Sequence, residues 1–271
     1  MSSTTAVFRV EWRKLAAQPR LRAGFAVLLI APWLFIALVL HQDRLPVETL
    51  YGRYLKDSGF ATPLVVLVFS TQWIFPLIAS LISGDVFSSE DAHGTWKTVL
   101  TRSVSRGEMF WGKVAAAFTA TVAAVVVLGT SATLAGVALV GSQPLVNVGG
   151  VLVPARSALG HVALSWLVVL PPVLAFAALA IAVSILTRSS VLGVLVPVVI
   201  GLVMQMYVFL NAWDTVRHVL LNSPMNAWRG LFDTPAYTDP LERGLLVALA
   251  YLAASIAISL IAFHRRDITG G

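Results

Sequence analysis

Long apolar stretches alternate with short polar ones along the whole chain. Six apolar runs stand out, at positions 22–40, 63–82, 114–140, 158–186, 191–210 and 244–263. A helix rises about 1.5 Å per residue, so about 20 apolar residues cross the ~30 Å hydrocarbon core of a bilayer. The pattern therefore predicts an all-α membrane protein with six transmembrane helices, formed by residues 1–271 as one domain.

The residues before the first run show a second helical pattern. Phe8, Trp12 and Leu15 fall at i, i+4 and i+7, and two arginines share another face. Glu11 and Lys14 are three residues apart, so they can pair on the helix surface. We expect residues 1–20 to form a basic amphipathic helix in the headgroup region. The alternative is a basic flank that serves only to orient the first span.

The longest polar stretch between spans, residues 211–243, is rich in aromatic side chains. They are Trp213, Trp228, Phe232 and Tyr237. Aromatic residues collect at membrane interfaces, and backbone that re-enters a membrane needs protein around it. The stretch therefore predicts two short helices, at 215–221 and 224–232, that dip into the outer leaflet. An ordinary structured loop is the alternative.

Composition and charge agree with a membrane location. Hydrophobic residues make up 58% of the chain and charged residues only 12%, against about 25% in soluble domains. There is no cysteine. The net charge of +6 comes from basic residues beside the apolar runs, which argues against nucleic-acid binding. With both ends inside, cytoplasmic segments hold twelve Lys and Arg and outer loops seven, so we expect cytoplasmic termini at the inner membrane.

The chain offers little catalytic chemistry. Residues 107–113 fit the first seven positions of a Walker A motif, but Val114 replaces the hydroxyl residue that would hold magnesium. An apolar run follows directly and three bulky side chains interrupt the motif, so nucleotide binding is rejected. The five histidines lack metal-ligand spacing. We expect no catalytic residue, no metal and no cofactor bound by this chain.

No Asp, Glu, Lys or Arg falls between the ends of the predicted spans. Carriers driven by protons need ionisable groups at membrane depth, so the energy for any uphill transport is expected to come from outside the chain. Uncharged polar residues in the spans mostly bond within their own helices. The candidates for a transport pathway or a dimer seam are Gln72, Gln205, Thr130 and Ser165.

Two further patterns concern helix geometry. Prolines predict kinks in spans two, four and five, at Pro76, Pro171–Pro172 and Pro197. Ala116, Ala120 and Ala124 form a stripe of small residues that favours close helix packing.

The polar segment between spans two and three, residues 83–113, carries four charges of each sign. Within it Trp96, Val99 and Leu100 fall at i, i+3 and i+4, so a short helix would present one apolar face. An apolar face on a charged segment at the membrane surface indicates a docking site for a partner protein.

At these residues the sequence resembles the permease subunits of ABC-2 type transporters. In that family the second span is followed by an acidic residue, then Gly-Thr, an amphipathic turn, a Pro-Val-Ser-Arg-like element and a final Gly-Lys. The matching residues are Glu90, Gly94-Thr95, Val104-Ser105-Arg106 and Gly112-Lys113. Two positions depart from the pattern, with Ala92 where a second acid is common and Ser103 where proline is common.

The resemblance implies a six-span exporter subunit, similar in fold to type V exporters, that docks two separate cytoplasmic ATPases and pairs with a second permease, identical or homologous. ATP and Mg would bind to the ATPase subunits. The resemblance places a coupling helix at 94–102 and a smaller contact at the loop 187–189. The residues implied in coupling are Glu90, Gly94, Thr95, Trp96, Lys97, Val99, Leu100, Arg102, Arg106, Thr187 and Arg188.

Apolar, uncharged spans favour an amphipathic substrate, such as a drug, a peptide or a lipid. Two other functions stay open on the sequence. One is an ion-coupled or passive carrier or channel, and the other is an ATPase-linked subunit that senses or assembles without transporting.

Overall fold

A computed structural model describes residues 3–42, 49–92, 94, 104–147, 149–209, 214–233 and 235–266 of this chain. Almost all of this is helical, as expected. The helices that span the length of the bundle are α2 (Pro19–His41), α3 (Ala61–Phe69) with α4 (Phe75–Ser83), α7 (Arg106–Leu139), α8 (Ala155–Val168) with α9 (Leu170–Thr187), α10 (Ser190–Phe209) and α12 (Asp239–Arg265). They form six segments long and apolar enough to cross a membrane.

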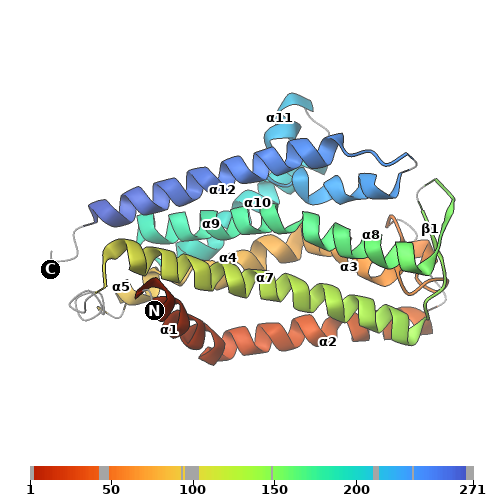
Figure 1. Ribbon diagram of the computed structural model, residues 1–271, viewed down its shortest axis with the longest axis horizontal. Helices are drawn as coiled ribbons and strands as arrows, with labels where there is room; N and C mark the ends of the chain where they lie inside the picture. The colour runs from red at the N-terminus through yellow and green to blue at the C-terminus, as the bar shows by residue number, and fades with distance from the viewer. Residues whose placement is uncertain are drawn as a thin grey trace.

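The shorter elements gather at the two ends of this bundle. They are α1 (Ser3–Ala17), α5 (Ser88–Ala92), α11 (Asp214–Val219), the 3-10 helices η1 (Gly52–Tyr54) and η3 (Pro224–Phe232), and the strands β1 (Leu145–Val146) and β2 (Leu152–Val153). Figure 1 shows α1, α5, the start of α7 and the end of α12 together at one end. We call this end of the bundle the α5 end. Both terminal helices reach this end, and the side of the membrane that it faces stays a prediction.

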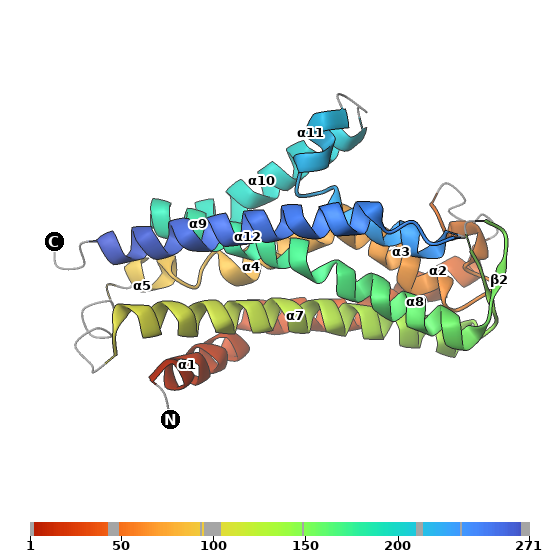
Figure 2. The same ribbon diagram turned by 45° about the horizontal axis from the view of Figure 1, so that its top comes forward.

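Helices α7 and α9 occupy the middle of the bundle. Figure 1 shows them between α12 on one edge and α2 on the other, and Figure 2 shows α10 leaning away from the bundle toward α11. The alanine stripe at Ala116, Ala120 and Ala124 is buried, as its spacing predicted. Ser131 on α7 donates a hydrogen bond of 2.5 Å to the carbonyl of Leu29 on α2, which ties these two helices together.

Two of the three predicted proline kinks coincide with breaks in the helix. Span two changes to a π-helical stretch, η2 (Ser70–Ile74), just before Pro76. Span four breaks at Val169, directly before Pro171–Pro172. Proline removes one backbone donor and clashes with the preceding turn, which accounts for both breaks. Pro197 lies inside α10, which stays continuous, so a kink there stays a prediction.

Span three starts eight residues earlier than expected from hydropathy. The helix begins at Arg106 rather than at Val114, so residues 106–113 belong to α7 and not to the preceding loop. The start is fixed by a capping box, in which Ser105 accepts from the Glu108 amide and the Glu108 carboxylate accepts from the Ser105 amide. Hydropathy missed this start because the first two turns are polar.

At the far end of the bundle, the structure contains an antiparallel hairpin, β1–β2, that the all-α prediction did not include. Both predicted helices of the segment 211–243 are present, as α11 and η3. The side chains of Trp228 and Phe232 are buried within the protein, where Phe232 packs edge-on against Tyr51 with ring centroids 5.4 Å apart. Burial against other elements explains Trp228 and Phe232, whereas Tyr237 is exposed and Trp213 lies outside the described residues. Their depth in a membrane stays a prediction.

The backbones of α4 and α10 meet at two glycines near the α5 end. A Cβ atom placed on Gly84 would lie 2.6 Å from the carbonyl carbon of Gly193. A Cβ atom cannot lie this close to a backbone atom unless the backbone shifts, so this contact requires glycine.

We expect Gly84→Ala to lower the unfolding temperature of the purified protein in detergent, because an inserted methyl group that forces backbone shifts costs about 1–3 kcal/mol. Gly160→Ala is the matched control, since a Cβ there meets nothing within 4 Å. It should be neutral or stabilising, because alanine is favoured over glycine in a helix by roughly 0.5–1 kcal/mol. Equal unfolding temperatures for the two variants would contradict the close approach of α4 and α10.

Candidate functional site

Three acidic residues follow α4 in quick succession, and each binds basic side chains from other helices. Asp85, Glu90 and Asp91 lie on the segment that leads from α4 through α5. Their partners come from α1, from the start of α2, from α7 and from the end of α12. We call this ion-paired cluster the junction. Its members are Glu11, Lys14, Arg20, Asp85, Glu90, Asp91, Lys113 and Arg266.

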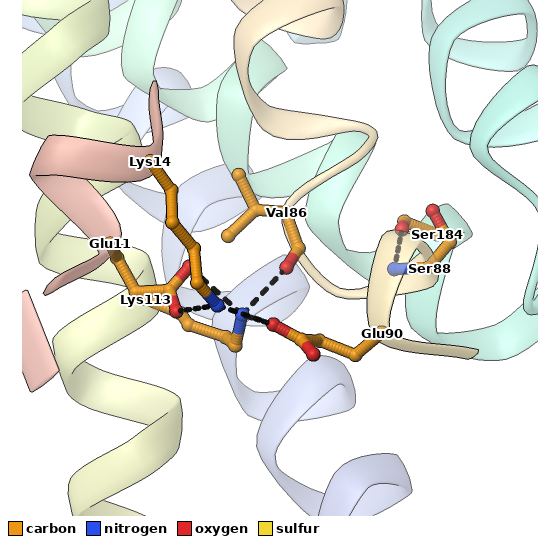
Figure 3. A network of polar contacts seen from close by, with 7 residues as sticks. All are labelled: Glu11, Lys14, Val86, Ser88, Glu90, Lys113 and Ser184. Carbon is orange, nitrogen blue, oxygen red and sulfur yellow. Dashed lines mark hydrogen bonds and ion pairs between the residues drawn. The ribbon is translucent and has the colours of Figure 1, made fainter. Parts of the chain in front are cut away.

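The ammonium group of Lys113 lies at the centre of the junction and is fully buried. Its Nζ donates to Glu11 Oε2 at 2.9 Å, to Glu90 Oε1 at 3.1 Å and to the carbonyl of Val86 at 3.0 Å. Figure 3 shows these acceptors converging on Lys113 from α1 and from the segment around α5. An ammonium group has three donors, so all three are satisfied. A buried charge is tolerated only when it is paired and hydrogen-bonded in this way.

Lys14 is the second lysine that pairs with Glu11 and Glu90, and it lies on the exposed side of the cluster. Its Nζ donates to Glu90 Oε1 at 2.8 Å and to Glu11 Oε1 at 3.0 Å, which confirms the predicted pairing of Glu11 with Lys14. Burial by itself would lower the pKa of Lys14, but hydrogen bonds and charges from Glu90 and Glu11 raise it above its ordinary value of 10.5. The stabilisation from Lys14 is therefore present at neutral pH and is lost only as the pH rises through that raised value.

Asp85 joins the start of α2 to the start of α10. It forms an ion pair with Arg20, and its other carboxylate oxygen accepts a hydrogen bond of 2.5 Å from the hydroxyl of Ser190. Ser88 lies close by, and its backbone amide donates to the hydroxyl of Ser184 on α9 at 3.3 Å. This segment is therefore bonded to α2, α9 and α10 as well as to α1 and α7.

Asp91 ties the junction to the end of the last helix. Arg266 donates to Asp91 Oδ1 at 2.6 Å. Arg106, in the first turn of α7, donates to the backbone carbonyls of His264 and Arg266 at 2.8 and 2.9 Å. Basic side chains commonly satisfy the last carbonyls of a helix in this way. Arg106 therefore holds the start of α7 against the end of α12, and Arg266 holds that end against Asp91.

An aromatic cluster packs against these ionic contacts. Phe87, Phe110 and Phe263 are fully buried, with ring centroids 5.5 to 6.0 Å apart. They come from the acidic segment, from α7 and from α12 in that order. The apolar cluster excludes water from one side of the junction, which strengthens the nearby charge interactions.

The predicted coupling residues divide between the described and undescribed parts of the chain. Thr95, Trp96, Lys97, Val99, Leu100 and Arg102 lie outside the described residues. Gly94 has a positive φ of 62° and lies two residues after the last residue of α5, a position where glycine commonly ends a helix. Glu90 and Arg106 are bound within the chain, as described above, so the structure gives both an internal role. Thr187 and Arg188 are exposed on the loop beside Ser190, and their docking role stays a prediction.

The predicted amphipathic helix forms, as α1, but it packs on protein. A Cβ atom on Gly112 would lie 2.5 Å from the Val7 side chain, so the backbone of α7 approaches α1 closely. Phe8 and Trp12 stack on each other with centroids 6.3 Å apart, partly buried. Glu11 is buried in the junction. Helix α1 is thus an integral part of the α5 end.

The candidate pathway residues are mostly bonded within the chain. Thr130 and Ser165 donate to carbonyls of their own helices, one turn back. Gln205 is buried and accepts a hydrogen bond of 3.0 Å from Asn222, in the segment before η3. Gln72 lies half-buried in the π-helical stretch of span two. A role in a pathway or dimer seam stays a prediction for all four.

The chemistry of the site is ionic and structural. Residues 107–113 form the first turns of α7, so the Walker-like segment is helix and not a phosphate-binding loop. Among the described residues, no group of His, Asp and Glu is arranged to hold a metal ion.

Sequence reasoning missed the partners of the acidic segment. Asp85 and Asp91 were not singled out, and Lys113 was taken as the end of a loop. A usable signal was present, because the three acids follow span two within seven positions while basic residues border the other spans. Hydropathy could not show that Lys113 would be buried, because that depends on α1 folding back against α7.

Six apolar helical segments and an ion-paired end define a multi-pass helical membrane protein. The sequence profile of the ABC-2 family transporter protein matches residues 7–205. The chain therefore belongs to the ABC-2 family and is a membrane-embedded permease component of a transporter. No curated protein matches the chain.

We expect Lys113→Met to destabilise the protein by about 3–5 kcal/mol, because it removes the buried partner of Glu11 and Glu90 and leaves them only the half-exposed Lys14. Lys14→Met is the matched control, since this side chain is half-exposed and contributes roughly 0–1 kcal/mol. Chemical unfolding in mild detergent measures both. Adding Glu11→Gln and Glu90→Gln to Lys113→Met should restore part of the loss. Equal losses for the two lysine variants would contradict the central role of Lys113.

Proposed function

We propose that this chain is the permease subunit of an ATP-driven exporter and that its α5 end faces the cytoplasm. The transporter would contain two separate ATPase subunits and a second permease. An ATPase would dock on the coupling element 94–102 of this chain, with a smaller contact at the loop 187–189. ATP and magnesium would bind to the ATPases, and this chain would perform no covalent chemistry.

The observation that carries the proposal is how the two ends of the segment 93–103 are held. On one side Glu90 and Asp91 are ion-paired to α1, α7 and α12. On the other side the capping box at Ser105 and the contacts of Arg106 fix the start of α7 to the end of α12. A force applied to the segment would therefore act on α1, α7 and α12 together. Such a segment suits a mechanical link to a motor protein.

The outer helices of the bundle are suited to lipid and to a second permease. In the apolar windows of α2 and α10 only 22% of the residues are buried, and in that of α12 only 17%. Because no charge interrupts these surfaces at mid-span, an amphipathic substrate such as a drug, a peptide or a lipid fits this chemistry best.

Purification of the tagged protein from its native membrane in mild detergent tests the proposal. An ATPase chain in near-equal amount supports the exporter. A preparation that contains no ATPase, with transport activity retained, would favour a carrier or channel. An ATPase whose rate of ATP hydrolysis is unchanged by every candidate substrate would favour a sensing or assembly subunit.

We expect Trp96→Ala combined with Leu100→Ala to abolish co-purification of the ATPase, because a buried aromatic and its apolar neighbour dominate interfaces of this kind. Membrane insertion should be unchanged. Trp111→Ala is the control, since this tryptophan is 47% exposed on α7 outside the segment. Retention of the ATPase by the double variant would remove the docking role of the segment.

A further inference from the structure

A groove runs between α2 and α4, with α7 as its floor, and opens to the outside of the bundle. Its volume is about 360 Å³. The side chains along it are apolar, including Leu28 and Ala31 on α2, Leu77 and Leu81 on α4, and Leu128 on α7. The exception is Arg20, which lines the groove at the α5 end. We call this the α2–α4 groove.

The dimensions of the α2–α4 groove suit one hydrocarbon chain. It follows α2 from Arg20 to Ala31. At about 1.5 Å per residue this is roughly 16 Å, which is about half of a ~30 Å hydrocarbon core. The groove therefore extends from a membrane surface to the middle of the bilayer, the depth of one leaflet.

Gly24 keeps the wall of this groove open. A Cβ atom at Gly24 would meet nothing within 4 Å, so packing inside the chain does not require glycine here. Glycine in a helix interior is disfavoured relative to alanine by roughly 0.5–1 kcal/mol. A glycine that faces open space, in the lining of an apolar groove, is explained by something that lies against it.

The mouth of the groove carries the charged side chain of Arg20. This side chain is 48% exposed although it pairs with Asp85, and Asp85 is not part of the lining. Basic pockets between membrane helices on the cytoplasmic side are typical sites for anionic lipid headgroups.

We propose that the α2–α4 groove binds an anionic phospholipid, with its phosphate at Arg20 and one acyl chain along Gly24 toward Ala31. The lipid would lie against α2 and α4 directly beside the junction, because Arg20 belongs to both. This site is independent of ATPase docking and of the exported substrate.

A second groove in the same protein supplies an internal comparison. It lies between α7 and α8, has a volume of about 410 Å³, and is lined by uncharged residues, among them Thr130, Leu134 and Trp166. Lipid chains can fill this groove, but nothing in its lining distinguishes one headgroup from another. It should take up anionic and zwitterionic lipids equally.

Photolabelling of the full-length protein in phosphatidylcholine vesicles tests the proposal. The vesicles carry a trace of phosphatidylglycerol or phosphatidylcholine with a photoreactive group in the acyl chain, and labelled peptides are located by mass spectrometry. We expect phosphatidylglycerol to label residues 20–31 and 74–82 about fivefold more than phosphatidylcholine does, the preference that one arginine at a membrane surface provides. The groove between α7 and α8 should show no preference.

Four variants separate the contribution of the apolar groove from that of the Arg20 charge. Gly24→Leu should abolish labelling of the α2–α4 groove by either lipid, whereas Gly160→Leu, at another glycine with open space, should leave it unchanged. Arg20→Gln should remove only the preference for phosphatidylglycerol. Asp85→Asn breaks the same ion pair but keeps the arginine, so the preference should persist or grow.

Three results would overturn the proposal. Equal labelling by both lipids in the wild-type protein would mean that bulk lipid fills the groove. Labelling that survives Gly24→Leu would place the lipid elsewhere. Absence of label from the wild-type groove, together with crosslinks between two copies of the chain there, would mean that a second copy covers it.

Discussion

The buried ammonium group of Lys113 is the constraint on which the α5 end of this protein depends. Burying an unpaired charge costs far more than a domain can spare, so the fold must bring acceptors to it from several directions. It does so by folding α1 back against α7 and by running the acidic segment past both, which places Glu11, Glu90 and the carbonyl of Val86 around one nitrogen. Removal of any of these elements would leave the charge exposed to an apolar interior.

The same constraint explains why so many helices end at one place. Asp85 and Asp91 extend the cluster to α2, α10 and α12, and the three phenylalanines close it on the inside. Helix α7 then runs from the junction along the whole bundle, 34 residues or roughly 50 Å of continuous helix. A displacement at the junction would therefore reach the opposite end through a rigid element. In the proposed transporter the energy source lies outside the chain. The chain therefore needs a rigid element such as α7 to transmit the displacement.

Most of the architecture could be predicted from sequence, because it depends on local patterns. Hydropathy located six spans, helical spacing located α1, and proline located the breaks at Pro76 and Pro171–Pro172. Prediction failed where the outcome depended on which elements meet. The start of α7 at Arg106 depends on a capping box that hydropathy does not register. The partners of Glu90 depend on the approach of α1 to Gly112, which no periodicity encodes.

In the proposed transporter, the junction transmits movement of the segment 93–103 to distant helices. Hydrogen exchange of the complex with its ATPase, with and without a non-hydrolysable ATP analogue, tests this directly, because exchange reports local opening. The account predicts that the analogue changes exchange in residues 4–17 and 260–266 as well as in the docking segment. In Asp91→Asn the response at 260–266 should become smaller, because only the Arg106 contacts then hold the end of α12, while the response at 4–17 remains. A response confined to residues 93–103 in the wild-type complex would contradict the account.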